Sequence, residues 1–330
     1  MLLDVENLEI GFRTARGRRP AVDGVSFRIA AGEILGFAGE SGCGKSVTAL
    51  ALLGLAGATA KVAGRATFRG EELIGMPRSR LQRIRGRGIA MIFQDPATSF
   101  NPTQTIGRQV VESLRLADAG WTGEAARAVR ARACDLLREV SVPDPGRVLD
   151  SYPHELSGGL CQRAMIAMML AGEPALLIAD EPTTALDVTV QAQILELLRR
   201  LSDRRGMAVM LITHDLGVIA QTCARVAVMY CGRLVEVGPV ASVMRAPRHP
   251  YTAGLLASRM STGRRGVRPR SIPGTVPAPD ERPDGCRFAP RCPRAIAVCR
   301  TGVPMLPGDP HAHACFVPEP GSEALHVAAR

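Results

Sequence analysis

The stretch EILGFAGESGCGKSVTALALLGL, residues 33–55, joins three different patterns in one segment. It begins with an apolar run of strand type, continues through GESGCGKS at residues 39–46, and ends in an apolar run of helical type. The glycines allow a tight loop whose backbone N–H groups surround an anion, and the N-terminus of the following helix favours the same charge. The segment therefore predicts a strand, a phosphate-binding loop and a helix in succession.

This P-loop pattern assigns a task to individual residues. Lys45 would reach the β- and γ-phosphates of a nucleotide, and the hydroxyl of Ser46 would bind Mg²⁺. The residues expected around the nucleotide are Gly39, Glu40, Ser41, Gly42, Cys43, Gly44, Lys45 and Ser46. A nucleotide and Mg²⁺ are therefore the ligands that the loop predicts, although the loop alone does not separate kinases, GTPases, helicases and motors.

A second motif follows another predicted strand. The run PALLIAD, residues 174–180, ends in Asp180, and Glu181 comes next. A buried strand that ends in carboxylates delivers them to the C-terminal edge of a parallel sheet. We expect Asp180 to hold Mg²⁺ through water and Glu181 to polarise the attacking water as general base. Two acids after a strand can also form a solvated turn, but the P-loop upstream favours the catalytic interpretation.

Between these motifs lies LSGGLCQRAMIAMML, residues 156–170, a Ser-Gly-Gly turn that opens an apolar helix. In isolation the serine could be a simple helix cap. Because it precedes the Asp-Glu pair by about 20 residues, the segment resembles the signature sequence of ATP-binding cassette (ABC) ATPases. Other motifs of that family appear in order: FQDP with Gln94, ALD at 185–187 with Asp187, and THD with His214.

The ABC resemblance implies further roles. Gln94 matches the glutamine that contacts Mg²⁺ and water and couples the site to a helical subdomain, and His214 matches the histidine that touches the γ-phosphate. Phe12 stands where the family has an aromatic side chain, more often tyrosine, that stacks on adenine. In ABC ATPases the signature of one subunit completes the γ-phosphate site of the other; the signature residues here are Ser157, Gly158 and Gly159. With one copy of each motif, the chain needs a second ATPase chain.

The order of patterns predicts an α/β fold. Up to about residue 240, short β-branched runs alternate with helical patterns, which is typical of a mostly parallel sheet. Between about 105 and 172 helical periodicity replaces strand patterns, as in residues 123–140. The predicted strands are 33–39, 87–94, 174–180, 207–215 and 225–238, the last as a hairpin. The resemblance implies a RecA-like core sheet, an antiparallel β subdomain and a helical subdomain inserted at about 100–172.

The composition changes near residue 261. The segment STGRRGVRPRSIPGTVPAPDERPDG, residues 261–285, is rich in proline, glycine and arginine, and it predicts a linker or an extended arm. We therefore divide the chain into an ABC ATPase domain, residues 1–260, and a C-terminal extension, residues 261–330.

Four of the nine cysteines lie in this extension, with spacings Cys286-x₅-Cys292-x₆-Cys299-x₁₅-Cys315. Four thiolates suit either tetrahedral zinc or a [4Fe–4S] cluster, and unligated thiols are the third possibility. The wide spacings count against zinc, whose sites usually begin with a shorter Cys-x-Cys interval. The residues alone leave these alternatives open.

The C-terminal third extends the resemblance. APRHPYTAGLLAS, residues 246–258, and GCRFAPRCPRAIAVC, residues 285–299, resemble the extension of the oligopeptide/dipeptide importer ATPases, a family that also includes importers of nickel and related solutes. The resemblance covers essentially the whole chain and implies an iron–sulfur cluster at the four cysteines. GKSVTAL, residues 44–50, looks like the first of the two ATPases in a heterodimeric importer.

The resemblance implies an ATP-hydrolysing subunit that energises the import of di- or oligopeptides. Nickel, glutathione or another small solute is the alternative cargo, and a soluble ABC ATPase acting on nucleic acid is the less favoured class. The implied partners are a homologous second ATPase, two transmembrane permeases and, indirectly, a periplasmic or extracellular solute-binding protein. The expected location is peripheral, on the cytoplasmic face of the inner membrane.

Bulk properties agree with these expectations. The first residues lack a signal-peptide pattern, and the apolar runs fall short of the roughly 18 residues that a membrane-spanning helix needs. The net charge of +10 comes with a strong preference for arginine, since Lys45 and Lys61 are the only lysines. Because an arginine-rich proteome explains such a bias, the charge does not lead us to expect nucleic acid as a partner.

Overall fold

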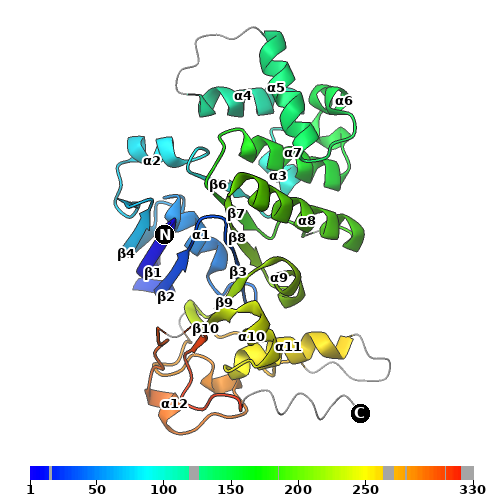
Figure 1. Ribbon diagram of the computed structural model, residues 1–330. Helices are drawn as coiled ribbons and strands as arrows, with labels where there is room; N and C mark the ends of the chain where they lie inside the picture. Colours follow the sequence, from blue (N-terminus) through cyan, green and yellow to red (C-terminus); the bar gives the residue numbers. More distant parts are fainter. Residues whose placement is uncertain are drawn as a thin grey trace. The chain divides into compact units, whose positions relative to one another are not determined.

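A computed structural model describes residues 1–14, 17–118, 126–184, 186–262, 271–278, 281–308 and 310–320 (Figure 1). The chain divides into two compact units. Unit 1 consists of Met1–Ile29, Leu35–Gly75 and Thr213–Arg330, and unit 2 of Ala30–Ile34 and Met76–Ile212. Parts of the predicted linker (263–270 and 279–280) and of the predicted helical run 123–140 (123–125) lie outside the described residues.

Unit 1 begins with an antiparallel sheet in the order β2-β1-β4-β5. Its strands are β1 (Leu3–Thr14), β2 (Gly17–Ile29), β4 (Ala60–Phe68) and β5 (Glu71–Glu72). In β1 the side chains of Leu3, Val5, Leu8 and Ile10 are buried, and the residues between them are more exposed, as in a sheet with one face on the core. This sheet is the antiparallel β subdomain that the resemblance implied.

A second set of strands in unit 1 has the order β11-β10-β9-β3. Strand β3 (Ile34–Ala38) runs parallel to β9 (Arg225–Tyr230), whereas β10 (Arg233–Pro239) and β11 (Ala312–His313) pair antiparallel. The β9–β10 hairpin turns at Cys231 and Gly232, whose φ values of 46° and 85° are the positive angles that a two-residue hairpin turn requires. The predicted hairpin is therefore confirmed.

Unit 1 also contains helices, several of which lie near these strands (Figure 1). They are α1 (Lys45–Leu52), α9 (Leu216–Thr222), α10 (Val240–Arg245), α11 (Pro250–Thr262), the 3-10 helix η2 (Ala289–Arg291) and α12 (Val298–Thr301). No helix in the described part of the chain has the length and apolar character needed to cross a bilayer.

Unit 2 combines three parallel strands with helices. Strands β6 (Ile89–Ile92), β7 (Leu176–Asp180) and β8 (Ala208–Thr213) pair in the order β8-β7-β6, and their residues are buried. The helices are α2 (Arg78–Ile84), α3 (Pro96–Ser99), α4 (Ile106–Ala117), α5 (Ala126–Glu139), α6 (Pro145–Asp150), the 3-10 helix η1 (Pro153–Glu155), α7 (Gly158–Leu170) and α8 (Val188–Arg205). From Pro96 to Leu170 the described residues contain helices and no strand, as the periodicity predicted.

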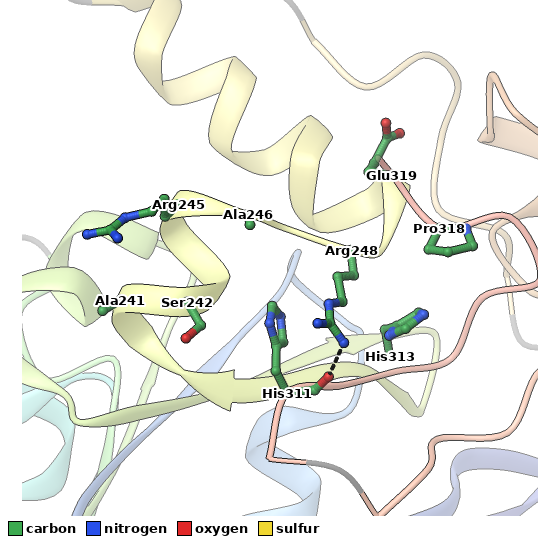
Figure 2. Close-up of a pocket in the computed structure, with 9 residues that line it drawn as sticks. All are labelled: Ala241, Ser242, Arg245, Ala246, Arg248, His311, His313, Pro318 and Glu319. Carbon is green, nitrogen blue, oxygen red and sulfur yellow. Dashed lines mark hydrogen bonds between the residues drawn. The ribbon is translucent and has the colours of Figure 1, made fainter. Parts of the chain in front are cut away.

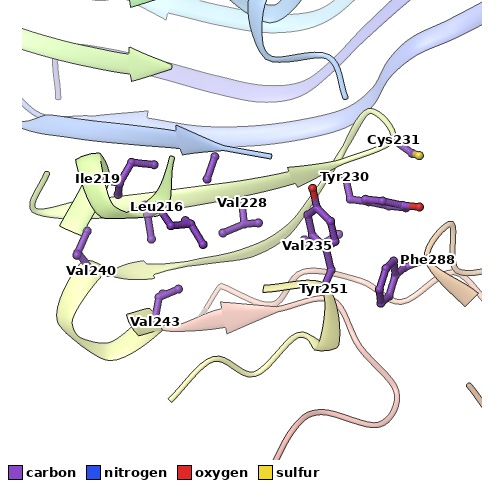
Figure 3. Close-up of a cluster of buried hydrophobic side chains, with 12 residues drawn as sticks. Leu216, Ile219, Val228, Tyr230, Cys231, Val235, Val240, Val243, Tyr251 and Phe288 are labelled. Carbon is purple, nitrogen blue, oxygen red and sulfur yellow. The ribbon is translucent and has the colours of Figure 1, made fainter. Parts of the chain in front are cut away.

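The C-terminal extension contributes to the hydrophobic core of unit 1. The ring of Phe288 lies 5.2 Å from that of Tyr230 and 5.4 Å from that of Tyr251, measured between centroids, and the two tyrosine rings are 4.6 Å apart (Figure 3). These rings join Val228, Val235 and other buried residues of the β9–β10 hairpin in one cluster. The packing of the extension therefore supports the hairpin.

Phe288→Ala tests this shared core. Removing a buried phenylalanine ring is expected to lower the free energy of unfolding by about 3–5 kcal/mol. Urea unfolding measures the change, with Met305→Ala as control, because Met305 is an 82% exposed side chain of the same extension. Equal stability of the two variants would contradict the role of Phe288 in the core.

Candidate functional site

The predicted P-loop connects β3 to α1 and packs closely against the β9–β10 hairpin. Gly39 has φ 148°, and a Cβ at this position would lie 2.2 Å from the carbonyl oxygen of Met229, so a side chain cannot be accommodated. The carbonyl of Cys43 accepts a hydrogen bond from the N–H of Gly232 at 2.7 Å. Gly44, with φ 112°, then leads into α1. The loop therefore has the compact shape that a phosphate cradle needs.

The buried lysine of the loop folds back onto it. The Nζ atom of Lys45 donates to the carbonyl oxygens of Gly39 at 2.7 Å and Glu40 at 3.0 Å. Ser46 follows at the start of α1 and is exposed. This places an ammonium group inside the loop and a hydroxyl group at its end, the two groups that a nucleotide with Mg²⁺ requires.

Glu40 has two further contacts that the sequence did not indicate. Its N–H donates to the hydroxyl of Tyr251 at 2.8 Å, and its carboxylate forms an ion pair with Arg291. Both partners lie more than 200 residues away along the chain, and no local sequence pattern identifies them.

In unit 2 the structure brings two predicted residues together. Gln94 follows β6, and its Nε2 atom donates to Oε2 of Glu181 at 3.4 Å. The hydroxyl of Thr184 donates to the same oxygen at 2.9 Å, a contact that sequence reasoning missed. Asp180, 6% exposed, ends β7 directly before Glu181. A carboxylate held by two neutral donors is suited to orient water and accept its proton.

Glu181 also has an unusual backbone. Its φ of 48° lies in the left-handed region, which a residue with a side chain seldom adopts and which is found frequently at functional sites. The N–H of Glu181 donates to the carbonyl of Ile212 at 2.9 Å, which anchors the residue to the end of β8. The backbone of Glu181 is therefore held in place at the end of the sheet.

The signature turn lies beside the predicted D-loop in unit 2. Ser157 caps α7 by accepting a hydrogen bond from the N–H of Leu160 at 3.4 Å, and Asp187 caps α8 through the N–H of Val190 at 2.9 Å. A Cβ on Gly159 would lie 2.9 Å from the Val190 side chain, so glycine permits this close approach. Gly158 is exposed, as are Ser157 and Asp187. Residue 185 of the predicted ALD motif lies outside the described residues.

The remaining predicted residues lie in unit 1. His214 is exposed and follows β8, directly before Asp215, which caps α9. Phe12 lies in β1, partly buried, opposite Ala60 of β4. Unit 1 thus holds Phe12, the P-loop residues and His214, and unit 2 holds Gln94, Asp180, Glu181, Asp187 and the signature.

The four cysteines of the extension interact with one another. The N–H of Cys286 donates to the carbonyl of Cys299 at 2.9 Å. Burial, followed by the neighbouring charges of Cys286, Cys292 and Cys299, raises the pKa of Cys315 to about 11. Within the described residues, however, no group of three or more His, Cys, Asp or Glu side chains is arranged to hold a metal ion.

A separate cavity in unit 1 lies beside α10 and β11. Its volume is about 590 Å³, and its lining includes Arg245, Arg248, His311 and Glu319 (Figure 2). The Nη1 atom of Arg248 donates to the carbonyl of His311 at 3.0 Å, so a hydrogen bond joins two of the residues that line the cavity. The residues that line this cavity are different from those of the predicted nucleotide site.

Two family models match the chain. Residues 22–184 match "ABC transporter", and residues 235–299 match "Oligopeptide/dipeptide transporter, C-terminal region". A probable peptide ABC transporter ATP-binding protein of Sinorhizobium fredii is 51% identical over 96% of this chain and 95% of its own length. The dipeptide transport ATP-binding protein DppD of Escherichia coli is 46% identical over 92% of each chain.

Solved structures give the same fold. A dimeric ATP-binding cassette in a post-hydrolysis state with ADP and Pi aligns with a TM-score of 0.64 and 26% identity over 72% of this chain and 99% of its own. The cbiO1 protein of Clostridium perfringens, part of an ABC transporter complex, aligns with a TM-score of 0.63 over 80% of this chain and 95% of its own. The predicted ABC fold is confirmed.

Glu181→Gln tests the candidate general base. The amide cannot accept the proton of water, so steady-state ATP hydrolysis is expected to fall by about 100-fold or more with nucleotide binding retained. Phosphate release and nucleotide titration measure the two effects. Glu173→Gln is a matched control, because Glu173 is an exposed glutamate of unit 2 that also has a positive φ of 49°. Wild-type turnover in Glu181→Gln would remove Glu181 from this role.

Proposed function

The chain belongs to the ABC transporter family of ATPases, and we propose that it is the ATP-hydrolysing subunit that energises a peptide importer. The observation that carries this proposal is the combination of two matches. The cassette model covers residues 22–184, and the oligopeptide/dipeptide transporter region covers residues 235–299. Relatives named as a probable peptide ABC transporter ATP-binding protein and a dipeptide transport ATP-binding protein align over at least nine-tenths of the chain, so the likeness includes the extension.

The P-loop residues 39–46 would bind the ATP phosphates. Lys45, already inside the loop, would exchange its contacts with loop carbonyls for contacts with the β- and γ-phosphates. Phe12 would stack on adenine. The hydroxyl of Ser46, the carboxylate of Asp180 and the amide of Gln94 are oxygen donors of the kind that Mg²⁺ prefers, and they would hold the ion. Bound Mg²⁺ neutralises charge on the phosphates.

Hydrolysis would use Glu181 as the general base. Gln94 and Thr184 hold one of its oxygens, so the carboxylate is oriented before water arrives. His214 would contact the γ-phosphate. Gln94 has a second role in this proposal, because it follows β6 and precedes helix α3 at the start of the helical segment. It would transmit the state of the nucleotide to the helical subdomain at about 100–172.

The exposed signature indicates a role in assembly. Ser157, Gly158 and Asp187 are exposed, and one copy of each motif is present in the sequence. A second ATPase subunit, which we propose to be a homologous chain, would receive this signature at its nucleotide and supply its own in return. The ATPase domain, residues 1–260, would act on two transmembrane permeases from the cytoplasmic face of the inner membrane. A solute-binding protein would deliver the peptide from the other side.

For the cysteines of the extension, residues 261–330, we propose a [4Fe–4S] cluster. The wide intervals between the four cysteines count against zinc, whose sites usually begin with a shorter interval between two cysteines. Four thiolates are the number of ligands that a [4Fe–4S] cluster requires. Burial raises the pKa of Cys286, Cys292 and Cys315, and the backbone N–H groups of Phe288, Arg294 and Val317 beside these sulfurs offset part of that rise.

The proposal that the imported solute is a peptide is based on the names of the relatives. Within the same family, nickel, glutathione or another small solute is the alternative cargo, since the binding protein and the permeases select the solute. Uptake of labelled dipeptide, nickel and glutathione by a deletion strain and by the complemented strain separates these candidates.

Lys45→Ala tests the nucleotide site, and this chain offers a matched control. Losing the ammonium group should weaken the binding of ATP with Mg²⁺ by about 100-fold or more, which corresponds to roughly 3 kcal/mol for charge-assisted contacts to phosphate. Lys61, the other lysine, is exposed in β4, so Lys61→Ala should bind ATP like wild type. Unchanged affinity in Lys45→Ala would contradict the P-loop assignment.

The cluster proposal is tested on protein purified without oxygen. We expect about four iron and four sulfide per chain, and loss of both in Cys292→Ser. Cys134→Ser is the control, because Cys134 lies in α5, outside the extension. Colourless protein that contains zinc would contradict the proposal.

A further inference from the structure

Arg291 of the extension reaches the P-loop. It ends the short helix η2, directly before Cys292, and its side chain is only 5% exposed. Its Nη1 and Nη2 atoms donate to Oε2 and Oε1 of Glu40 at 2.7 and 3.1 Å. Such a bidentate ion pair fixes the carboxylate in orientation as well as in position. Glu40 is the second residue of the loop GESGCGKS.

The guanidinium of Arg291 is itself fixed by other contacts. Its Nε atom donates to the carbonyl of Pro273 at 2.9 Å, and Nη1 donates to the hydroxyl of Tyr230 at 3.3 Å. The guanidinium carbon also lies 5.8 Å from the centre of the Tyr230 ring. A lysine at this position could not replace these contacts, because its ammonium group lacks the planar arrangement of several N–H donors.

The backbone of Glu40 is held by Tyr251. The Tyr251 hydroxyl accepts from the N–H of Glu40 at 2.8 Å, and its ring packs among Tyr230 and Phe288 (Figure 3). The N–H of Tyr251 donates to Nδ1 of His249 at 3.1 Å. Burial lowers the pKa of His249 to about 3, so the imidazole is neutral and can accept this bond. Side chain and backbone of Glu40 are therefore both fixed by residues outside the ATPase motifs.

We propose that Tyr251 of α11 and Arg291 of the cysteine-containing extension are positioning residues of the phosphate loop, and that through Arg291 the extension sets the affinity for ATP. The inference rests on the proposed function of the loop. Lys45 donates to the carbonyls of Gly39 and Glu40, so a displaced Glu40 would displace the ammonium group as well. A loop that is already shaped for the phosphates loses less free energy in ordering when it binds them.

Charge gives Arg291 a second effect. Glu40 places a carboxylate in a loop that binds a highly anionic triphosphate, and the two would repel each other if Glu40 were unpaired. Arg291 neutralises that carboxylate from inside the protein. Removing Arg291 therefore weakens ATP binding in two ways, and removing the charge of Glu40 at the same time restores part of the affinity.

The test is a double-mutant cycle on the full chain, with the dissociation constant of ATP with Mg²⁺ as readout. Arg291→Met should weaken binding about tenfold, and adding Glu40→Gln should recover at least half of that loss on a logarithmic scale. The KM for ATP should rise in parallel, with kcat within about twofold of wild type, because Glu181 is unchanged. Arg294→Met is the matched control, since Arg294 pairs with Glu319 at 3.4 Å and not with the loop.

Several results would overturn the proposal. One is equal ATP affinity in Arg291→Met and Arg294→Met. Another is strict additivity of the changes in binding free energy that Arg291→Met and Glu40→Gln cause. If Arg291→Met does not fold, Tyr251→Phe keeps the ring and removes the acceptor for the Glu40 N–H. It should weaken ATP binding about threefold, and wild-type affinity would overturn the proposal. Wild-type protein that fails to bind ATP would instead refute the proposed function.

Discussion

The close packing of the P-loop on the β9–β10 hairpin is the constraint on which the other features of unit 1 depend. Gly39 lies so near the carbonyl oxygen of Met229 that a Cβ would come within 2.2 Å, and Gly232 donates to the carbonyl of Cys43. The hairpin can hold this position because aromatic rings of α11 and the extension pack behind it. The proposed phosphate site is thus supported by residues from opposite ends of the chain.

In unit 2 a residue of the candidate site is likewise held in place by its surroundings, here in a strained backbone conformation. Glu181 adopts a left-handed φ, which costs on the order of 1 kcal/mol or more and persists only where the surroundings require it. The hydrogen bond from the N–H of Glu181 to the carbonyl of Ile212 holds the backbone in this conformation, and hydrogen bonds from Gln94 and Thr184 hold the side chain. If Glu181 is the base proposed above, a carboxylate fixed in advance needs little rearrangement when water and phosphate arrive.

The sequence predicted those parts whose cause is local. The P-loop, the strand ending in Asp180 and the Cys231-Gly232 hairpin turn follow from short patterns, and the structure contains each of them. The antiparallel sheet was not located from the residues, because β1 shifts register between Val5 and Leu8, where Asn7 has φ 49°, and this bulge breaks the alternation. The pairing of Arg291 with Glu40 could not be predicted from the sequence, because 251 residues separate the two side chains along the chain.

The central claim is that ATP hydrolysis at this chain drives peptides across a membrane. Its most direct test is uptake of labelled dipeptide by vesicles that contain this chain, a second ATPase subunit, the two permeases and the binding protein. The account predicts accumulation that requires ATP, and hydrolysis that the loaded binding protein stimulates. Hydrolysis that responds to DNA and is indifferent to the permeases, with no uptake of dipeptide, would contradict it.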